Sequence, residues 1–296
     1  MSMLRSWGAL LIREYREHRM AFLYFPAGIL LLLTISSVSG LFTNRARLAL
    51  LPLAGNSLKL FEIGDLLIMA LWFAYLCITL FFYFGDAFAA DRRNNAMFFW
   101  KSMPVSDLRI LAGKFLAGVT LFPVIIYIAG LIGGLVLFAL MSLASALVPG
   151  FPAIDAVAML TSYGQIAIFA AVYIMLALLW YAPFFAWVGA LSTAFGRWSI
   201  PLALLIPVVF SLLEGVIDFG SAPGGSYVIS FLKQRLSFSF DAADMRTALF
   251  SNAPLDVPGL IGTLIAGVNW PSLLGGLVFA AVVIYAASEY RRRVIT

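Results

Sequence analysis

The stretch DRRNNAMFFWKSMPVSDLRILAGK, residues 91–114, joins two long apolar runs of the chain. Apolar runs of such length are typical of membrane-spanning helices, so a helix on either side holds this charged and aromatic segment at one face of a membrane. Phe98, Phe99 and Trp100 are consecutive, and consecutive helical side chains point in different directions. A single apolar stripe cannot bury all three rings, which indicates that the segment docks against another protein.

The residue order of this segment resembles the cytosolic coupling segment of the ABC type-2 permease family, the membrane halves of ATP-binding-cassette transporters. The resemblance rests on an acidic residue and two arginines at 91–93, on Ser-x-Pro-Val-Ser at 102–106, and on Gly113-Lys114 in the next membrane helix. It implies that residues 91–106 sit in a cleft of a separate ATPase subunit. The residues that it assigns to this ATPase coupling are Asp91, Arg92, Arg93, Phe98, Phe99, Trp100, Lys101 and Pro104.

The same resemblance implies an assembly and a location. Two permease chains, identical or different, would work with two copies of the ABC ATPase subunit in the bacterial cytoplasmic (inner) membrane. ATP and Mg would be bound by the ATPase, so no cofactor is expected in this chain. Most members of the family are exporters, but neither the substrate nor the direction of transport follows from the sequence.

Composition excludes a soluble globule. The chain has 296 residues, of which 63% are hydrophobic and 11% charged, too few polar residues to cover a water-soluble surface. No stretch outside the apolar runs could build a second core, so we expect a single transmembrane domain over residues 1–296, which the resemblance identifies as a permease domain. The formal net charge is +5, but the basic residues flank the apolar runs. Membrane lipids are therefore expected partners and nucleic acid is not.

The apolar runs predict an all-α integral membrane protein with six transmembrane helices. We expect these helices at residues 21–41, 65–90, 108–148, 159–194, 198–219 and 271–287. The third run would reach about 60 Å as a helix, twice the hydrocarbon thickness, and could hide a hairpin. We favour one helix with an outer extension, because Gly130, Gly133 and Gly134 come without the polar residues of a turn. Gly130 and Gly134 also form a small-xxx-small pair that lets another helix approach closely.

Three further elements complete the prediction. Residues 1–19 form an amphipathic helix, expected to be an interfacial elbow, with Glu14 and His18 toward its apolar side. Residues 91–106 form a cytosolic coupling helix between the second and third spans. Residues 220–269 form an extracytoplasmic loop, whose apolar patch at 257–268 is too short to span and predicts a short interfacial or re-entrant helix.

Charge sets the expected orientation. With both termini in the cytoplasm, six of the 19 Lys and Arg residues fall outside, namely Arg45, Arg47, Lys59, Lys233, Arg235 and Arg246. The other 13 fall on the cytoplasmic side, as the positive-inside rule requires.

The sequence offers little catalytic chemistry. It contains no G-x-x-x-x-G-K-[ST] phosphate loop, so the chain is not expected to hydrolyse ATP by itself. One histidine, His18, and one cysteine, Cys77, cannot assemble a metal site or a nucleophilic triad, so we predict neither a metal nor a catalytic residue. Asp65 and Asp86 lie at the ends of the second span, where solvated caps are expected.

Glu214 and Asp218 are the unusual carboxylates of the predicted fifth span. Their spacing of four puts both on one helix face, where like charges repel. They are candidates for a translocation path or for a cation or proton site. Alternatively, they lie in water at the outer interface, near Lys233 or Arg235.

We therefore expect the membrane permease subunit of an ABC transporter, driven by ATP that a separate subunit hydrolyses. An ion- or proton-coupled secondary transporter, with Glu214 and Asp218 as its coupling site, is one alternative. A non-transporting membrane scaffold or sensor that docks a cytosolic partner is another.

Overall fold

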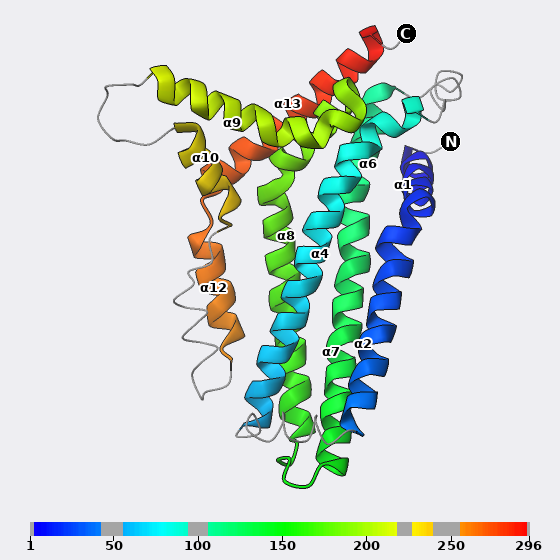
Figure 1. Ribbon diagram of the computed structural model, residues 1–296, viewed down its shortest axis with the longest axis vertical. Coiled ribbons are helices and arrows are strands. Elements are labelled where there is room, and N and C mark those ends of the chain that lie inside the picture. Colours follow the sequence, from blue (N-terminus) through cyan, green and yellow to red (C-terminus); the bar gives the residue numbers. More distant parts are fainter. Residues whose placement is uncertain (1–2, 43–55, 94–105, 218–226, 239–254, 295–296) are drawn as a thin grey trace.

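The computed structural model describes residues 3–42, 56–93, 106–217, 227–238 and 255–294. Within these ranges the regular elements are helices and no strand occurs, so the predicted all-α class is confirmed. Four long helices run side by side in Figure 1, and they are α2 (Phe25–Leu41), α4 (Ser57–Arg93), α7 (Phe122–Leu147) and α8 (Ala156–Phe195). Helix α4 packs against both α7 and α8 and forms the centre of the bundle.

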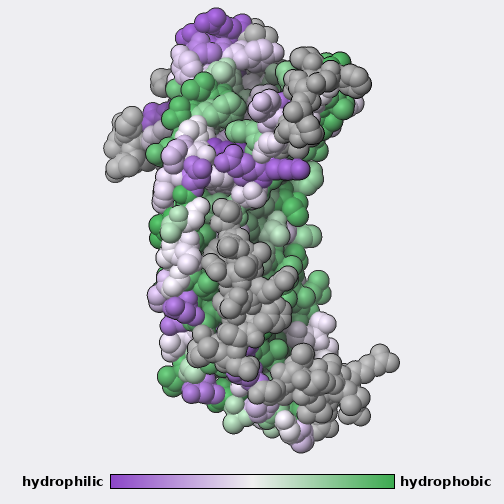
Figure 2. All heavy atoms as spheres, turned by 90° about the vertical axis from the view of Figure 1, so that its left-hand side faces the viewer, coloured by the Kyte–Doolittle hydropathy of each residue, from purple (hydrophilic) through white to green (hydrophobic). Residues whose placement is uncertain are grey.

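Five helical runs among the described residues are long and apolar enough to cross a membrane. They are Trp7–Leu41, Ser57–Asp91, Asp107–Leu147, Ala156–Val216 and Trp270–Arg293. A multi-pass membrane protein is the class that these runs indicate. Hydrophobic residues cover much of the body in Figure 2, whereas hydrophilic ones gather toward the end where the chain terminates.

The difference from the predicted six spans lies between α8 and α9 (Ser199–Ile217). Only the 3-10 turn η4 (Gly196–Trp198) separates these helices, and Figure 1 shows α9 running across the end of the bundle instead of antiparallel to α8. The reason is a contact that the sequence pattern does not reveal. The Ser199 hydroxyl donates to the Gly85 carbonyl at 2.7 Å, and Ile200 occupies the space beside Gly85, so the start of α9 is fixed on α4.

The long third run is one helical segment and not a hairpin, as expected. It consists of α6 (Asp107–Leu116), the π-helical turn η3 (Ala117–Leu121) and α7. The close approach predicted for its glycines is also confirmed. A Cβ atom added at Gly130 would lie 2.8 Å from Met69 Sδ on α4, and one added at Gly134 would lie 2.8 Å from Tyr163 Cε2 on α8.

The N-terminal helix α1 (Met3–Arg19) continues through the π-helical turn η1 (Met20–Tyr24) into α2. Figure 1 shows α1 turned away from the direction of α2. One side of α1 packs on α6, which explains why its apolar face can carry the buried Glu14. The predicted interfacial position of this helix remains a prediction.

The last three helices among the described residues are α10 (Tyr227–Leu236), α12 (Val257–Gly267) and α13 (Trp270–Val294). Helix α12 is the short apolar helix expected within residues 220–269, and it packs on α8, as α13 also does. Both chain termini, the end of α4 and the start of α6 lie at one end of the molecule, and the connection between α7 and α8 lies at the other (Figure 1).

Candidate functional site: a buried ion cluster at the base of residues 94–105

Four helices meet at a buried cluster of ionised side chains. Its members come from α1, α4, α6 and α13, and they are Arg13, Glu14, Asp91, Asp107, Lys114 and Arg291. Three are basic and three acidic, so the charges balance. Because a buried charge is strongly unfavourable unless it is paired, this balance is what allows the cluster to exist inside the protein.

Asp91 is the centre of the cluster and is 2% exposed. Its Oδ2 accepts a hydrogen bond from Arg291 Nη1 at 3.1 Å. Its Oδ1 accepts one from Arg13 Nη2 at 3.4 Å and lies 3.5 Å from Lys114 Nζ. One carboxylate therefore joins the last turn of α4 to three other helices.

Lys114 connects Asp91 to a second carboxylate, that of Glu14. The distance from Lys114 Nζ to Glu14 Oε1 is 3.3 Å, and both side chains are buried. The Tyr83 hydroxyl lies 2.9 Å from Glu14 Oε2 and 3.0 Å from the Lys114 carbonyl. Helix α1 is thus fixed to α4 and α6 by polar contacts as well as by its apolar face.

Arg291 holds both ends of the segment that joins α4 to α6. While Nη1 binds Asp91, just before residues 94–105, Nε lies 2.9 Å from Oδ1 of Asp107, just after them. Asp107 is in the first turn of α6, where the N-terminal dipole favours a carboxylate, and the Ser106 hydroxyl caps the same turn by accepting from the Arg109 N–H. The guanidinium of one C-terminal residue therefore fixes both anchor points of the predicted coupling segment.

Two π-helical turns lie next to this cluster. Each comes immediately before a Phe-Pro pair, η1 before Phe25-Pro26 and η3 before Phe122-Pro123. The turns contact each other's helices, and the rings of Phe22 and Phe122 stack with their centroids 3.9 Å apart. Single π-turns inside α-helices are frequent at functional sites.

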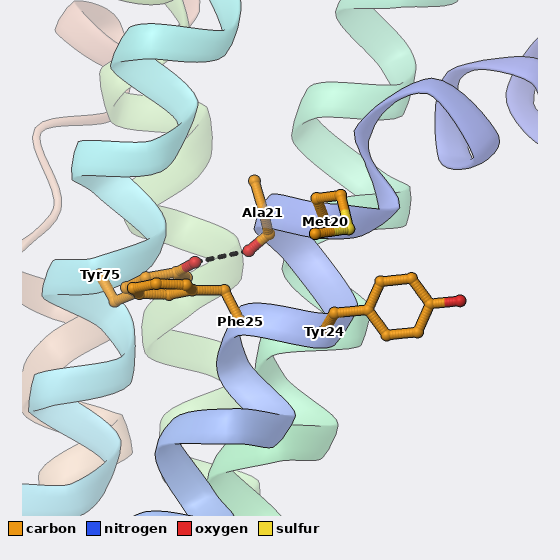
Figure 3. A pocket seen from close by; sticks show the side chains of 5 residues that line it. All are labelled: Met20, Ala21, Tyr24, Phe25 and Tyr75. Carbon is orange, nitrogen blue, oxygen red and sulfur yellow. Dashed lines mark hydrogen bonds between the residues drawn. The ribbon is translucent and has the colours of Figure 1, made fainter.

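Proline explains the polar contact made by the first of these turns. The Phe25 N–H donates to the Met20 carbonyl, and Pro26 has no N–H, so the Ala21 carbonyl is left without a backbone donor. The Tyr75 hydroxyl of α4 donates to it instead (Figure 3). Met20, Tyr24 and Phe25 complete an open apolar groove around this bond.

The predicted coupling residues are distributed as follows. Asp91 is buried in the ion cluster, so any contribution that it makes to ATPase coupling would be indirect. Arg92 and Arg93 end α4, but their side chains are outside the described part. The remaining ones are also outside the described residues, and they are Phe98, Phe99, Trp100, Lys101 and Pro104.

Of the two carboxylates proposed for a translocation path, Glu214 has an evident structural contact. It accepts from the backbone N–H groups of Tyr227 at 2.6 Å and Val228 at 3.1 Å, and so caps the N-terminus of α10. Asp218 lies outside the described residues. Of this pair, Glu214 alone therefore has a described position.

Sequence reasoning did not identify the cluster, although two signals were present. Lys114 interrupts an apolar run, and Glu14 lies on the apolar side of an amphipathic helix. Arg291 follows the buried positions Ala280, Ile284 and Ala287 at helical spacing, which places it on the internal face of α13.

Glu14, Glu17 and His18 bring their ligand atoms within 4.8 Å of one another. The two carboxylates of this group already pair with bases, since Lys114 lies 3.3 Å from Glu14 and Arg13 lies 2.7 Å from Glu17. Ion pairs with bases of the cluster therefore account for both carboxylates, and the group gives no reason to assign a metal.

Comparison of the chain with protein-family models, with curated proteins and with solved structures finds no match.

Proposed function

We propose that this chain is the membrane permease subunit of an ABC transporter, an exporter whose energy comes from ATP hydrolysed by a separate ATPase subunit. The observation that carries the proposal is the double contact of Arg291 with Asp91 and Asp107, at the two ends of residues 94–105. A segment that only reconnected two spans would need no such buried fixation. A segment that receives force from a partner needs rigid anchor points.

The ion cluster suggests how force would move through the protein. A push on residues 94–105 would act on α4 through Asp91 and on α6 through Asp107. Because Arg291 links these two residues and Lys114 links Asp91 to α1, four helices would shift together. A rigid-body movement of this kind is a common form of conformational switching, and the π-turns beneath the cluster are where α1 and α6 could change direction relative to α2 and α7.

The proposal includes the finer predictions from the sequence. Helix α1 is the interfacial elbow, residues 91–106 are the coupling segment, and both termini face the cytoplasm of a bacterial cell. Two permease chains and two ATPase chains form the transporter. The placement of both termini and both anchors at one end of the molecule is consistent with this arrangement (Figure 1).

The experiment is co-purification with candidate ABC ATPases of the same organism, using a double variant Phe99→Ala and Trp100→Ala. We expect less bound ATPase and little stimulation of its hydrolysis by the permease, with unchanged folding of the chain. Trp270→Ala is the matched control, because Trp270 is an exposed aromatic residue on α13. Equal co-purification and equal stimulation with the double variant and the control would refute the proposal.

Two other functions give different results in the same system. A secondary transporter would continue transport after ATP depletion, which a permease driven by an ATPase would not. A scaffold or sensor would bind a cytosolic partner without any stimulation of ATP hydrolysis by a transported substrate.

A further inference from the structure

A second buried acidic site lies far from the ion cluster. Asp65, on α4, has no exposed surface, and neither of its carboxylate oxygens has a hydrogen-bond partner among the described residues. The sequence predicted a solvated cap at this position, and that prediction is wrong because α4 begins eight residues earlier, at Ser57, and carries Asp65 into the bundle.

Helices α7 and α8 pack closely on Asp65. It lies against Gly134 of α7, where an added Cβ atom would collide with its Oδ1 and would come 2.8 Å from Tyr163 Cε2 of α8. The Tyr163 hydroxyl is directed elsewhere, since it donates to the Leu131 carbonyl at 2.9 Å.

The charged residues near Asp65 on α4 already have partners. Glu62, one turn earlier, lies 3.3 Å from Lys59 Nζ. It also accepts from the Ser162 hydroxyl at 3.0 Å and from the Leu255 N–H at 3.2 Å. Lys59 is therefore neutralised by Glu62, and Asp65 is left without a described counter-ion.

Two ligands could neutralise the Asp65 carboxylate, a metal cation or a proton. Hard cations require about six oxygen ligands, and no group of three or more His, Cys, Asp or Glu residues that includes Asp65 could hold an ion in the described part of the chain. An isolated ionised carboxylate in an apolar interior is so unfavourable that the group takes up a proton instead. We propose that Asp65 is a proton-binding site: its carboxyl is neutral in the folded protein, and α4, α7 and α8 must separate before the proton can leave.

This placement has a consequence for α4. Asp65 and Asp91 are 26 positions apart in one helix, roughly 40 Å at 1.5 Å per residue. The same helix thus carries a proton site at one end and the ion cluster at the other. A change in the tilt of α4 would therefore move both the proton site and the ion cluster.

Labelling by dicyclohexylcarbodiimide tests the proposal on the full chain in lipid vesicles at neutral pH. This apolar reagent adds to protonated carboxyls, because the acid proton passes to a carbodiimide nitrogen while the carboxyl oxygen bonds to the central carbon. Peptide mass spectrometry should find at least tenfold more adduct at Asp65 than at Asp256, an exposed aspartate that caps α12. A water-soluble carbodiimide with an added amine should give the reverse preference.

Infrared spectroscopy supplies a measurement that does not depend on reagent access. The wild-type spectrum should contain the carbonyl band of a protonated carboxyl that the Asp65→Asn variant lacks, and the two proteins should have similar melting temperatures because an amide resembles a neutral acid in size. An ionised-carboxylate band lost in Asp65→Asn would overturn the proposal. Should that variant fail to fold, the protonated-carboxyl band of the wild-type protein decides, and its absence would overturn the proposal. Tenfold protection from labelling by sodium chloride, but not by choline chloride, would also overturn it in favour of a cation.

Discussion

At the scale of single residues, Arg291 is a charged side chain of the cluster that is almost completely buried. Its side chain is 1% exposed, whereas the side chains of its neighbours Arg292 and Arg293 are 66% and 75% exposed. The three consecutive arginines are therefore not equivalent. When the protein folds, the Arg291 guanidinium loses its contact with water and gains ion pairs with two carboxylates. Removing one partner of a buried ion pair leaves the other charge buried and unpaired.

The expected effect of Arg291→Ala is a loss of about 3–5 kcal/mol of unfolding free energy, because Asp91 would keep its charge and lose its best donor. Arg292→Ala removes an exposed ion pair with Glu289, and it should change the unfolding free energy by less than about 1 kcal/mol. Reversible denaturation in detergent measures both. Similar losses for the two variants would show that Arg291 has no special role.

At the scale of elements, glycine determines how closely α7 approaches α4. Gly133 and Gly134 are both buried, and their missing side chains leave room for Ile68 and Asp65 of α4. Without a strong hydrophobic drive between helices in lipid, close contact of this kind is what favours association.

Gly133→Ala tests this contact. The new methyl would lie 2.9 Å from Ile68 Cγ2, and we expect a loss of about 1–3 kcal/mol from overpacking. Gly28→Ala in α2 is the control, since no atom lies within 4 Å of the position of its added Cβ. The melting temperature should fall in Gly133→Ala and should stay unchanged or rise in Gly28→Ala. A fall in Gly28→Ala without a fall in Gly133→Ala would contradict the packing described.

The π-turn η1 makes a second prediction at this scale. Tyr75→Phe removes the hydroxyl that donates to the Ala21 carbonyl, which Pro26 leaves without a backbone donor. We expect a loss of about 1 kcal/mol, the net value of one hydrogen bond. Tyr285→Phe, at an exposed position on α13, should leave the melting temperature unchanged. An equal response of both variants would mean that the hydroxyl of Tyr75 does not stabilise the turn.

At the scale of the whole molecule, the bundle has two distinct ends. One contains both termini and the ion cluster, and the other contains the connection between α7 and α8 (Figure 1). If the long helices cross a membrane, these ends lie on opposite sides of it.

Cysteine labelling tests this arrangement. In a Cys77→Ala background, Arg293→Cys should react with a membrane-impermeant maleimide only in inside-out vesicles. Ala153→Cys, in the connection between α7 and α8, should react only in intact cells, and both positions are exposed. Reaction of both cysteines from the same side would contradict the topology.

Much of the fold follows from local pattern. A helix satisfies its backbone hydrogen bonds within a short segment, so the lengths of apolar runs predict where helices form whatever they pack against. That is why residues 65–90 fall within α4 and why residues 108–148 form one helical segment. The same reasoning could not predict the direction of α9, because that direction depends on a contact between Ser199 and Gly85.

The sequence alone determined the membrane class, the positions of most helices and the segment whose anchors Arg291 holds. Only the tertiary structure decided which charges are partners, because Asp91 and Arg291 are 200 positions apart and no local pattern links them. It also decided that Asp65 is buried without a hydrogen-bond partner among the described residues, while Glu62, one turn away, has several. The physical reason is that charge state and burial depend on the packing of distant helices, whereas helix formation does not.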